Sequence, residues 1–205
     1  MSDGGLGMGM NAVVEVLVQV LRLAHIGFFA VGIGVAVFLE ALILRDVARP
    51  ITRARTEFLT QGHVLITWAV KGLWITGLAM IIGAIGFLGV ELSGKLFTKL
   101  AVVTILTANM LVIDWHVVPT LVSLRGKALT DLPPNEIGRL GAIGGLSAAC
   151  WGLAVLIGGM PVVAQLPPEI AISAVLGTLV CAPIVGGYWA RWLVMHANRI
   201  VLPAE

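Results

Sequence analysis

One stretch decides the fold of this chain: Lys95–Leu124, with the sequence KLFTKLAVVTILTANMLVIDWHVVPTLVSL. It exceeds the roughly 20 residues that a helix needs to cross a bilayer, and most of its side chains are apolar. At about 100° per residue, five of its polar side chains share an arc of roughly 100°, whereas Asp114 lies off it; the five are Lys95, Lys99, Asn109, His116 and Thr120. Ionisable groups at membrane depth are costly and usually face a bundle interior or a cavity. The stretch therefore predicts a membrane helix with one polar face.

The composition places the whole chain in the same class. Hydrophobic residues make up 59% of the 205 residues and charged residues only 12%, about half the charged share of a soluble domain. We therefore expect a single integral-membrane domain over residues 1–205, with the lipid bilayer as its main partner. The net charge of +2 and the lack of a basic cluster interleaved with aromatic residues argue against nucleic-acid binding.

Five apolar segments are long enough to span a bilayer, so the predicted fold is an all-α bundle of five transmembrane helices. The predicted spans are Leu23–Leu44, Val64–Val90, Leu96–Leu121, Leu140–Ala164 and Ile170–Trp189. Residues 1–22 form a short additional segment. Its apolar part, Ala12–Arg22, either extends the first span outward or lies at the membrane interface.

Basic residues predict the orientation of this bundle, because cytoplasmic loops carry an excess of Lys and Arg. Every second connection is basic: the first loop carries Arg45, Arg49, Arg53 and Arg55, the third carries Arg125, Lys127 and Arg139, and the tail carries Arg191 and Arg199. The second loop has only Lys95, with Lys99 just inside the membrane, and the fourth has no basic residue. This pattern predicts an outside N-terminus and a cytoplasmic C-terminus.

Ionisable side chains of the first three spans fall into two predicted depth layers. The outer layer holds Arg22, His25 and Lys99, and the inner layer holds Glu40, His63, Asp114 and His116. Because the last two spans carry almost nothing ionisable, we expect the first three helices to share a polar interior. The last two helices would then serve as apolar packing partners.

These layers suggest three kinds of function. In the outer layer, the imidazole of His25 is a good axial ligand for haem iron, and Arg22 or Lys99 would pair with the propionates; alternatively, these residues only mark the membrane boundary. In the inner layer, Lys71, Asp114 and His116 would line the path of a permease for a metal ion or small solute. The third possibility is a structural or assembly subunit whose polar stripes only fix helix register.

Two segments resemble a known family. LRLAHIGFFAVGIGVAVF, residues 21–38, is similar to the first span of small bacterial membrane proteins that include the copper-resistance D-type proteins and the multi-span haem-pathway protoporphyrinogen oxidase. KLFTKLAVVTILTANMLVIDWHVVP, residues 95–119, resembles the later Lys-bearing span of that family. Asn109 occupies the place of a His in the porphyrin-oxidising members, and with His116 and Pro119 it is closer to the uncharacterised relatives.

The resemblance implies a b-type haem-binding or porphyrin-handling redox protein of the bacterial inner membrane. It implies His25 and Lys99 as the functional pair, with His25 as the iron ligand. The residues around the cofactor would be Arg22, His25, Asn109 and His116. A homodimer or a larger membrane complex is compatible with so few spans. Whether the protein is an oxidoreductase stays open at this point.

Overall fold

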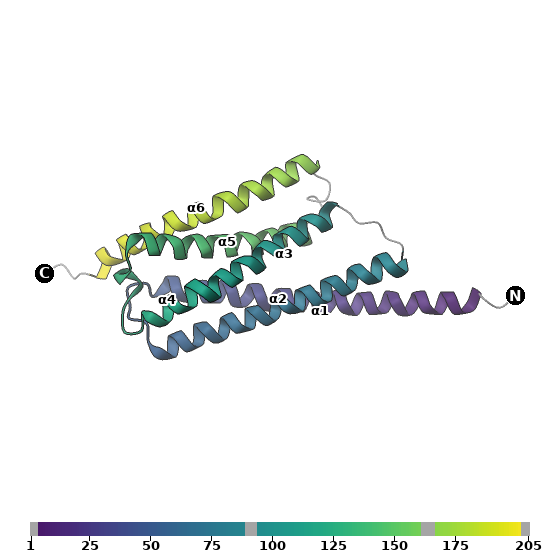
Figure 1. The fold of residues 1–205 in the computed structure, drawn as a ribbon, viewed down its shortest axis with the longest axis horizontal. Coiled ribbons are helices and arrows are strands. Elements are labelled where there is room, and N and C mark those ends of the chain that lie inside the picture. Colours follow the sequence, from purple (N-terminus) through teal and green to yellow (C-terminus); the bar gives the residue numbers. More distant parts are fainter. Residues whose placement is uncertain (1–3, 89–93, 161–166, 202–205) are drawn as a thin grey trace. The chain divides into compact units, whose positions relative to one another are not determined.

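The computed structural model describes residues 4–88, 94–160 and 167–201, which fold almost entirely into helices (Figure 1). The long helices are α1 (Gly4–Arg45), α2 (Arg53–Leu88), α3 (Gly94–Val112), α5 (Pro134–Gly159) and α6 (Pro168–Val201). α3 continues through a π-helical turn, η1 (Ile113–Val117), into the short α4 (Val118–Ser123), and a 3-10 turn, η2 (Leu129–Asp131), precedes α5.

Within the residues that the structure describes, five helical segments are long and apolar enough to cross a membrane, which confirms the predicted class and the five predicted spans. Their mean hydropathy ranges from 1.7 to 2.4, and they are Ala12–Arg45, Arg53–Gly83, Gly94–Ser123, Pro134–Gly159 and Glu169–Ala197. Many of their large apolar side chains are exposed, as expected where lipid replaces water as the solvent. The protein is therefore a multi-pass membrane protein.

The helix ends differ from the predicted spans in two informative places. α1 begins at Gly4, so the segment before Leu23 continues the first helix. α5 begins at Pro134 rather than near Leu140, because a proline at the first helical position has its φ angle preset and needs no intrahelical N–H bond. The predicted span ends at Val90 and Ala164 lie outside the described residues.

The chain divides into two compact units, each described here by itself. The first unit comprises the described parts of Met1–Val35 and His63–Ser93, and the second comprises those of Ala36–Gly62 and Gly94–Glu205. α1 and α2 each contribute to both units, so the boundary runs across helices rather than along a linker. The prediction of one domain over residues 1–205 stays a prediction.

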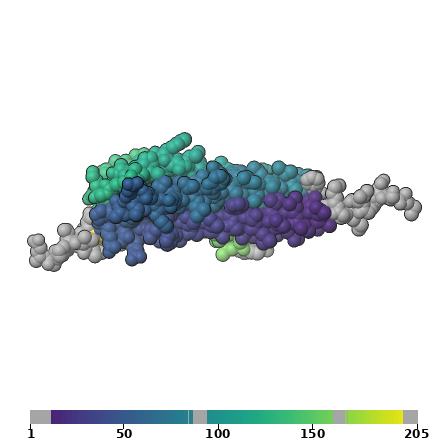
Figure 2. Space-filling model, turned by 90° about the horizontal axis from the view of Figure 1, so that it is seen from below, coloured from purple at the N-terminus to yellow at the C-terminus, as the bar shows by residue number. Residues whose placement is uncertain are grey.

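In the first unit, glycines of α2 receive side chains of α1. A Cβ atom built on Gly72 would lie 2.5 Å from the Phe28 ring, and one built on Gly83 would lie 3.3 Å from the Val18 side chain. The two helices pack side by side, as the purple and blue side chains in Figure 2 show. Small residues at these positions allow the close approach that packing in a membrane requires.

In the second unit, α5 and α6 meet along a seam of small residues. Cβ atoms added at Gly141 or Gly145 would collide with backbone atoms of Gly186 and Ala182 across the seam. The two helices run alongside one another over much of their length (Figure 1). Because van der Waals packing is a main source of helix association in lipid, this seam is the best-defined helix–helix interface of the unit.

Two basic loops of the second unit are joined by backbone hydrogen bonds. The N–H of Ile51 donates to the carbonyl of Lys127 at 2.8 Å, and the N–H of Gly126 donates to the carbonyl of Ile51 at 2.9 Å. Gly126 has φ +82°, a conformation that favours glycine. The Arg55 guanidinium caps the end of α1 by donating to the carbonyl of Leu42 at 2.8 Å. A cation there also offsets the negative end of the helix dipole.

Candidate functional site

His25 is held by a short hydrogen-bonded chain inside the first unit. Its Nδ1 lies 2.8 Å from Oγ1 of Thr76, which is buried in α2. The Thr76 hydroxyl lies 2.6 Å from the carbonyl of Gly72, one turn earlier, and a carbonyl can only accept. The single hydroxyl proton therefore points at Gly72, and Thr76 accepts from His25.

This chain of bonds shows how His25 uses its Nδ1 atom. Because Thr76 accepts, Nδ1 of the ring carries a proton and donates it to the hydroxyl oxygen. A hydrogen bond from one ring nitrogen is the usual way in which a protein orients a histidine that ligates metal through the other. Gly77 of α2 lies close to the ring, since a Cβ atom built there would lie 3.4 Å from Cε1 of His25. The ring of His25, a residue type that commonly ligates metals, is therefore held in a fixed orientation. The sequence could not show this orientation.

The two cations predicted to assist His25 lie in different units. Arg22 is exposed and sits one helical turn before His25 on α1. Lys99 is partly buried near the start of α3, in the second unit. Pairing of Lys99 with His25 therefore stays a prediction, whereas Arg22 and His25 share one helix.

The polar face of α3 turns toward α5. Asn109 is buried, and its Nδ2 donates to the carbonyl of Ile143 at 3.2 Å. We expected this face to join the first two helices, with the last two spans as purely apolar partners. Instead, the amide ties α3 to α5, because a buried amide must find a backbone or side-chain partner.

After Asn109, helix α3 ends at Val112 and the chain continues as the wider π-helical turn η1. The N–H of Val118 donates to the carbonyl of Ile113, five residues back, as a π-helix requires. Pro119 follows directly and has no N–H to offer the carbonyl of Trp115. The proline explains why the regular pattern breaks here, and such turns are frequent at functional sites.

The widened turn directs His116 toward the first turn of α5. Its Nε2 lies 3.3 Å from Oε2 of Glu136, within ion-pair distance but without the alignment of a hydrogen bond. Nη1 of Arg139 donates to the other carboxylate oxygen, Oε1, at 2.9 Å. Asp114, two residues before His116, is exposed. The three residues His116, Glu136 and Arg139 form a polar cluster between η1 and α5.

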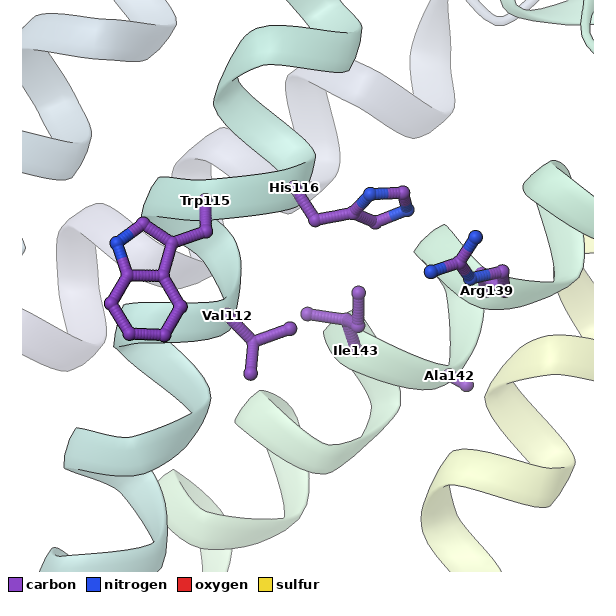
Figure 3. Close-up of a pocket in the computed structure, with 6 residues that line it drawn as sticks. All are labelled: Val112, Trp115, His116, Arg139, Ala142 and Ile143. Carbon is purple, nitrogen blue, oxygen red and sulfur yellow. The ribbon is translucent and has the colours of Figure 1, made fainter.

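An open pocket of about 450 Å³ adjoins this cluster. Figure 3 shows the imidazole of His116 and the guanidinium of Arg139 extending toward each other across it, with apolar side chains along one side. The lining residues are Val112, Trp115, His116, Arg139, Ala142 and Ile143. The pocket lies wholly within the second unit.

Sequence reasoning missed Glu136 as the partner of His116 and treated Arg139 only as a loop charge. One signal could have found them: Pro133–Pro134 followed by an acidic residue is typical of a helix start. Taking the helix from Pro134 places Glu136 and Arg139 one turn apart on α5, where they interact.

The other singled-out ionisable residues have separate surroundings. Lys71 is exposed and its Nζ lies 4.8 Å from the centre of the Trp68 ring. His63 is buried in α2. Nδ1 of His196 donates to the Trp192 carbonyl, 2.8 Å away on its own helix. Within residues 4–88, 94–160 and 167–201, no three His, Cys, Asp or Glu side chains converge on a point that would hold a metal ion.

Comparisons with known proteins returned no matching family model, no matching curated protein and no matching solved structure. What the fold and the sequence together establish is thus the class, a bundle of five apolar helices suited to a bilayer.

Proposed function

We propose that this protein is a b-type haem-binding or porphyrin-handling redox protein, with His25 as an axial ligand. The observation that carries the proposal is the bond between Nδ1 of His25 and Oγ1 of Thr76 at 2.8 Å, which orients the imidazole ring of a ligand-type residue. Imidazole nitrogen is the common protein ligand of haem iron. The family resemblance of residues 21–38 and 95–119 supports the same assignment.

The residues present fit such a cofactor in their donor chemistry. His25 offers an imidazole on an apolar helix, and Arg22, one turn away, offers a guanidinium for charge-assisted bonds to propionate carboxylates. Lys99 is proposed as a second ligand or as the partner of an anionic substrate group. A bound haem would supply one-electron redox chemistry, and the protein would supply its orientation and an apolar, water-poor setting.

An absorption spectrum of the purified protein tests this proposal. Protein expressed with sufficient haem is expected to show a Soret band and a reduced-minus-oxidised difference spectrum. The His25→Ala variant is expected to lose most of the Soret absorbance and most of the difference signal. His196→Ala is the matched control, because that histidine bonds to its own helix on α6 and has no proposed role. Haem-free wild-type protein, or a His25→Ala protein with an unchanged spectrum, contradicts the proposal and leaves the permease and assembly-subunit hypotheses.

We also propose that the N-terminus lies outside a bacterial inner membrane and the C-terminus in the cytoplasm. The support is the distribution of Lys and Arg, together with the hydrogen bonds that join the two most basic loops through Ile51, Gly126 and Lys127. A fluorescent protein fused to the C-terminus is expected to mature and fluoresce, whereas an alkaline phosphatase fused there is expected to be inactive. Active phosphatase at the C-terminus would reverse the orientation.

A further inference from the structure

The pocket beside His116 has its polar and apolar lining at different depths along the helices. α3 runs through η1 and α4 to a loop, and α5 begins after the same loop, so this loop marks one membrane end for both. The two ionisable lining residues, His116 and Arg139, lie nearest this end. Val112 lies about one turn deeper than His116, and Ala142 and Ile143 lie about one turn deeper than Arg139. Figure 3 shows the same order, with the imidazole and the guanidinium above the three apolar side chains.

The polar end of the pocket favours an anion. Both ionisable side chains that line it are basic, whereas Glu136 lies outside the lining. Nη1 of Arg139 donates to Oε1 of Glu136, but a guanidinium carries five N–H donors, so the others can serve a second acceptor. The Arg139 side chain is 60% exposed and therefore accessible. Its planar fork matches the oxygens of a phosphate group, to which it can donate two parallel hydrogen bonds.

The deeper part of the pocket favours a hydrocarbon chain. Val112, Ala142 and Ile143 have no polar side-chain atoms, and Val112 is 41% exposed on a membrane-spanning segment, so this wall meets lipid. Trp115 is 77% exposed at the depth of His116, and exposed tryptophan is enriched at the level of the lipid head groups. A free phosphate ion would leave the apolar wall without a partner, whereas an amphiphile with an anionic head group covers both parts.

We propose that this pocket binds an anionic glycerophospholipid, whose phosphate accepts hydrogen bonds from Arg139 beside His116 and whose acyl chain lies along the apolar lining residues. The order of head group and chain in such a lipid matches the order of polar and apolar lining along the helices. A zwitterionic lipid fits less well, because its ammonium group would lie beside two basic side chains. Basic pockets between membrane helices bind anionic lipid head groups in other proteins. The site goes beyond the haem proposal and does not depend on it, since it lies within the second unit and His25 lies in the first.

Native mass spectrometry of the full-length protein, delipidated in detergent micelles and titrated with one lipid at a time, tests the proposal. Dioleoylphosphatidylglycerol is the anionic probe, and dioleoylphosphatidylcholine has the same acyl chains with a zwitterionic head group. Wild-type protein is expected to bind the first phosphatidylglycerol about tenfold more tightly than the first phosphatidylcholine, the scale of one charge-assisted contact. Arg139→Gln is expected to abolish this preference. Arg125→Gln removes the same charge from an exposed residue outside the pocket and is expected to keep the preference.

A second variant guards against misfolding of Arg139→Gln. Val112→Phe starts from an exposed side chain, keeps both basic residues and places a ring where the acyl chain would lie. Its affinity for phosphatidylglycerol is expected to fall to that of the wild type for phosphatidylcholine. Inorganic phosphate, titrated alone as a third probe, is expected to give no adduct that depends on Arg139. Such an adduct would assign the pocket to a free anion and overturn the proposal.

Three further outcomes would also overturn it: equal affinity of the wild-type protein for the two lipids, an unchanged preference in Arg139→Gln, or an equal loss of preference in Arg139→Gln and Arg125→Gln. Bound haem appears in the same spectra as a separate mass increment. Failure of the haem proposal is therefore read independently of lipid binding, which requires no haem.

Discussion

Replacing Gly141 with alanine is expected to lower the free energy of unfolding by about 2 kcal/mol, the usual scale of overpacking in a close interface. A methyl group there would collide with the Ala190 side chain and with the backbone carbonyl of Gly186. A backbone carbonyl in the middle of α6 cannot move aside as a flexible side chain can, so the two helices must separate. Each separated contact loses dispersion energy that lipid replaces only in part.

The same helix provides the control for this measurement. A Cβ built on Gly144 meets nothing within 4 Å, so Gly144→Ala reports only the change in helix propensity. Both variants and the wild type would be unfolded reversibly in mixed detergent micelles and followed by circular dichroism. The result that contradicts the described seam is equal stability of the two alanine variants.

Thr76→Val is expected to weaken haem binding about 10- to 100-fold, the usual effect of losing the group that orients a ligating histidine. Valine has nearly the shape of threonine but cannot accept the Nδ1 proton of His25, which lies 2.8 Å from the hydroxyl. Without that acceptor the ring loses its fixed orientation. Titration of the haem-free protein with haem, followed in the Soret region, gives the affinity.

Two further variants separate this effect from a general loss of packing. Thr76→Ser keeps the hydroxyl and is expected to restore most of the affinity. Thr67→Val removes a hydroxyl from the same helix, where it donates to the carbonyl of His63 at 3.0 Å, and is expected to bind haem as the wild type does. Wild-type affinity in Thr76→Val would show that Thr76 does not position the ligand, even if His25 still binds the iron.

The membrane class followed from the sequence because it depends on a sum over many residues. Hydrophobic side chains make up 59% of the chain, and no rearrangement of the helices changes that total. The five spans were likewise visible, since crossing a bilayer requires about 20 apolar residues in a row whatever their neighbours are. Helix ends were less visible: the predicted fourth span begins at Leu140, whereas α5 begins at Pro134.

Partners of the polar residues could not be predicted, because helical periodicity says which residues share a face but not which helix that face meets. Asn109 and His116 share an arc, as the sequence indicated, but the structure turns that arc toward Ile143 and Glu136 of α5. For His25 the sequence supplied the residue type and the tertiary structure supplied Thr76, 51 positions away.

The sequence by itself determined the five helices of the described residues that are long and apolar enough to cross a membrane, because burial of apolar surface and satisfaction of backbone hydrogen bonds are local requirements of each helix in lipid. Only the tertiary structure decided which nitrogen of His25 donates to Thr76 and which carboxylate neighbours His116. Both depend on short distances between helices, and side-chain contacts at the interfaces set those distances.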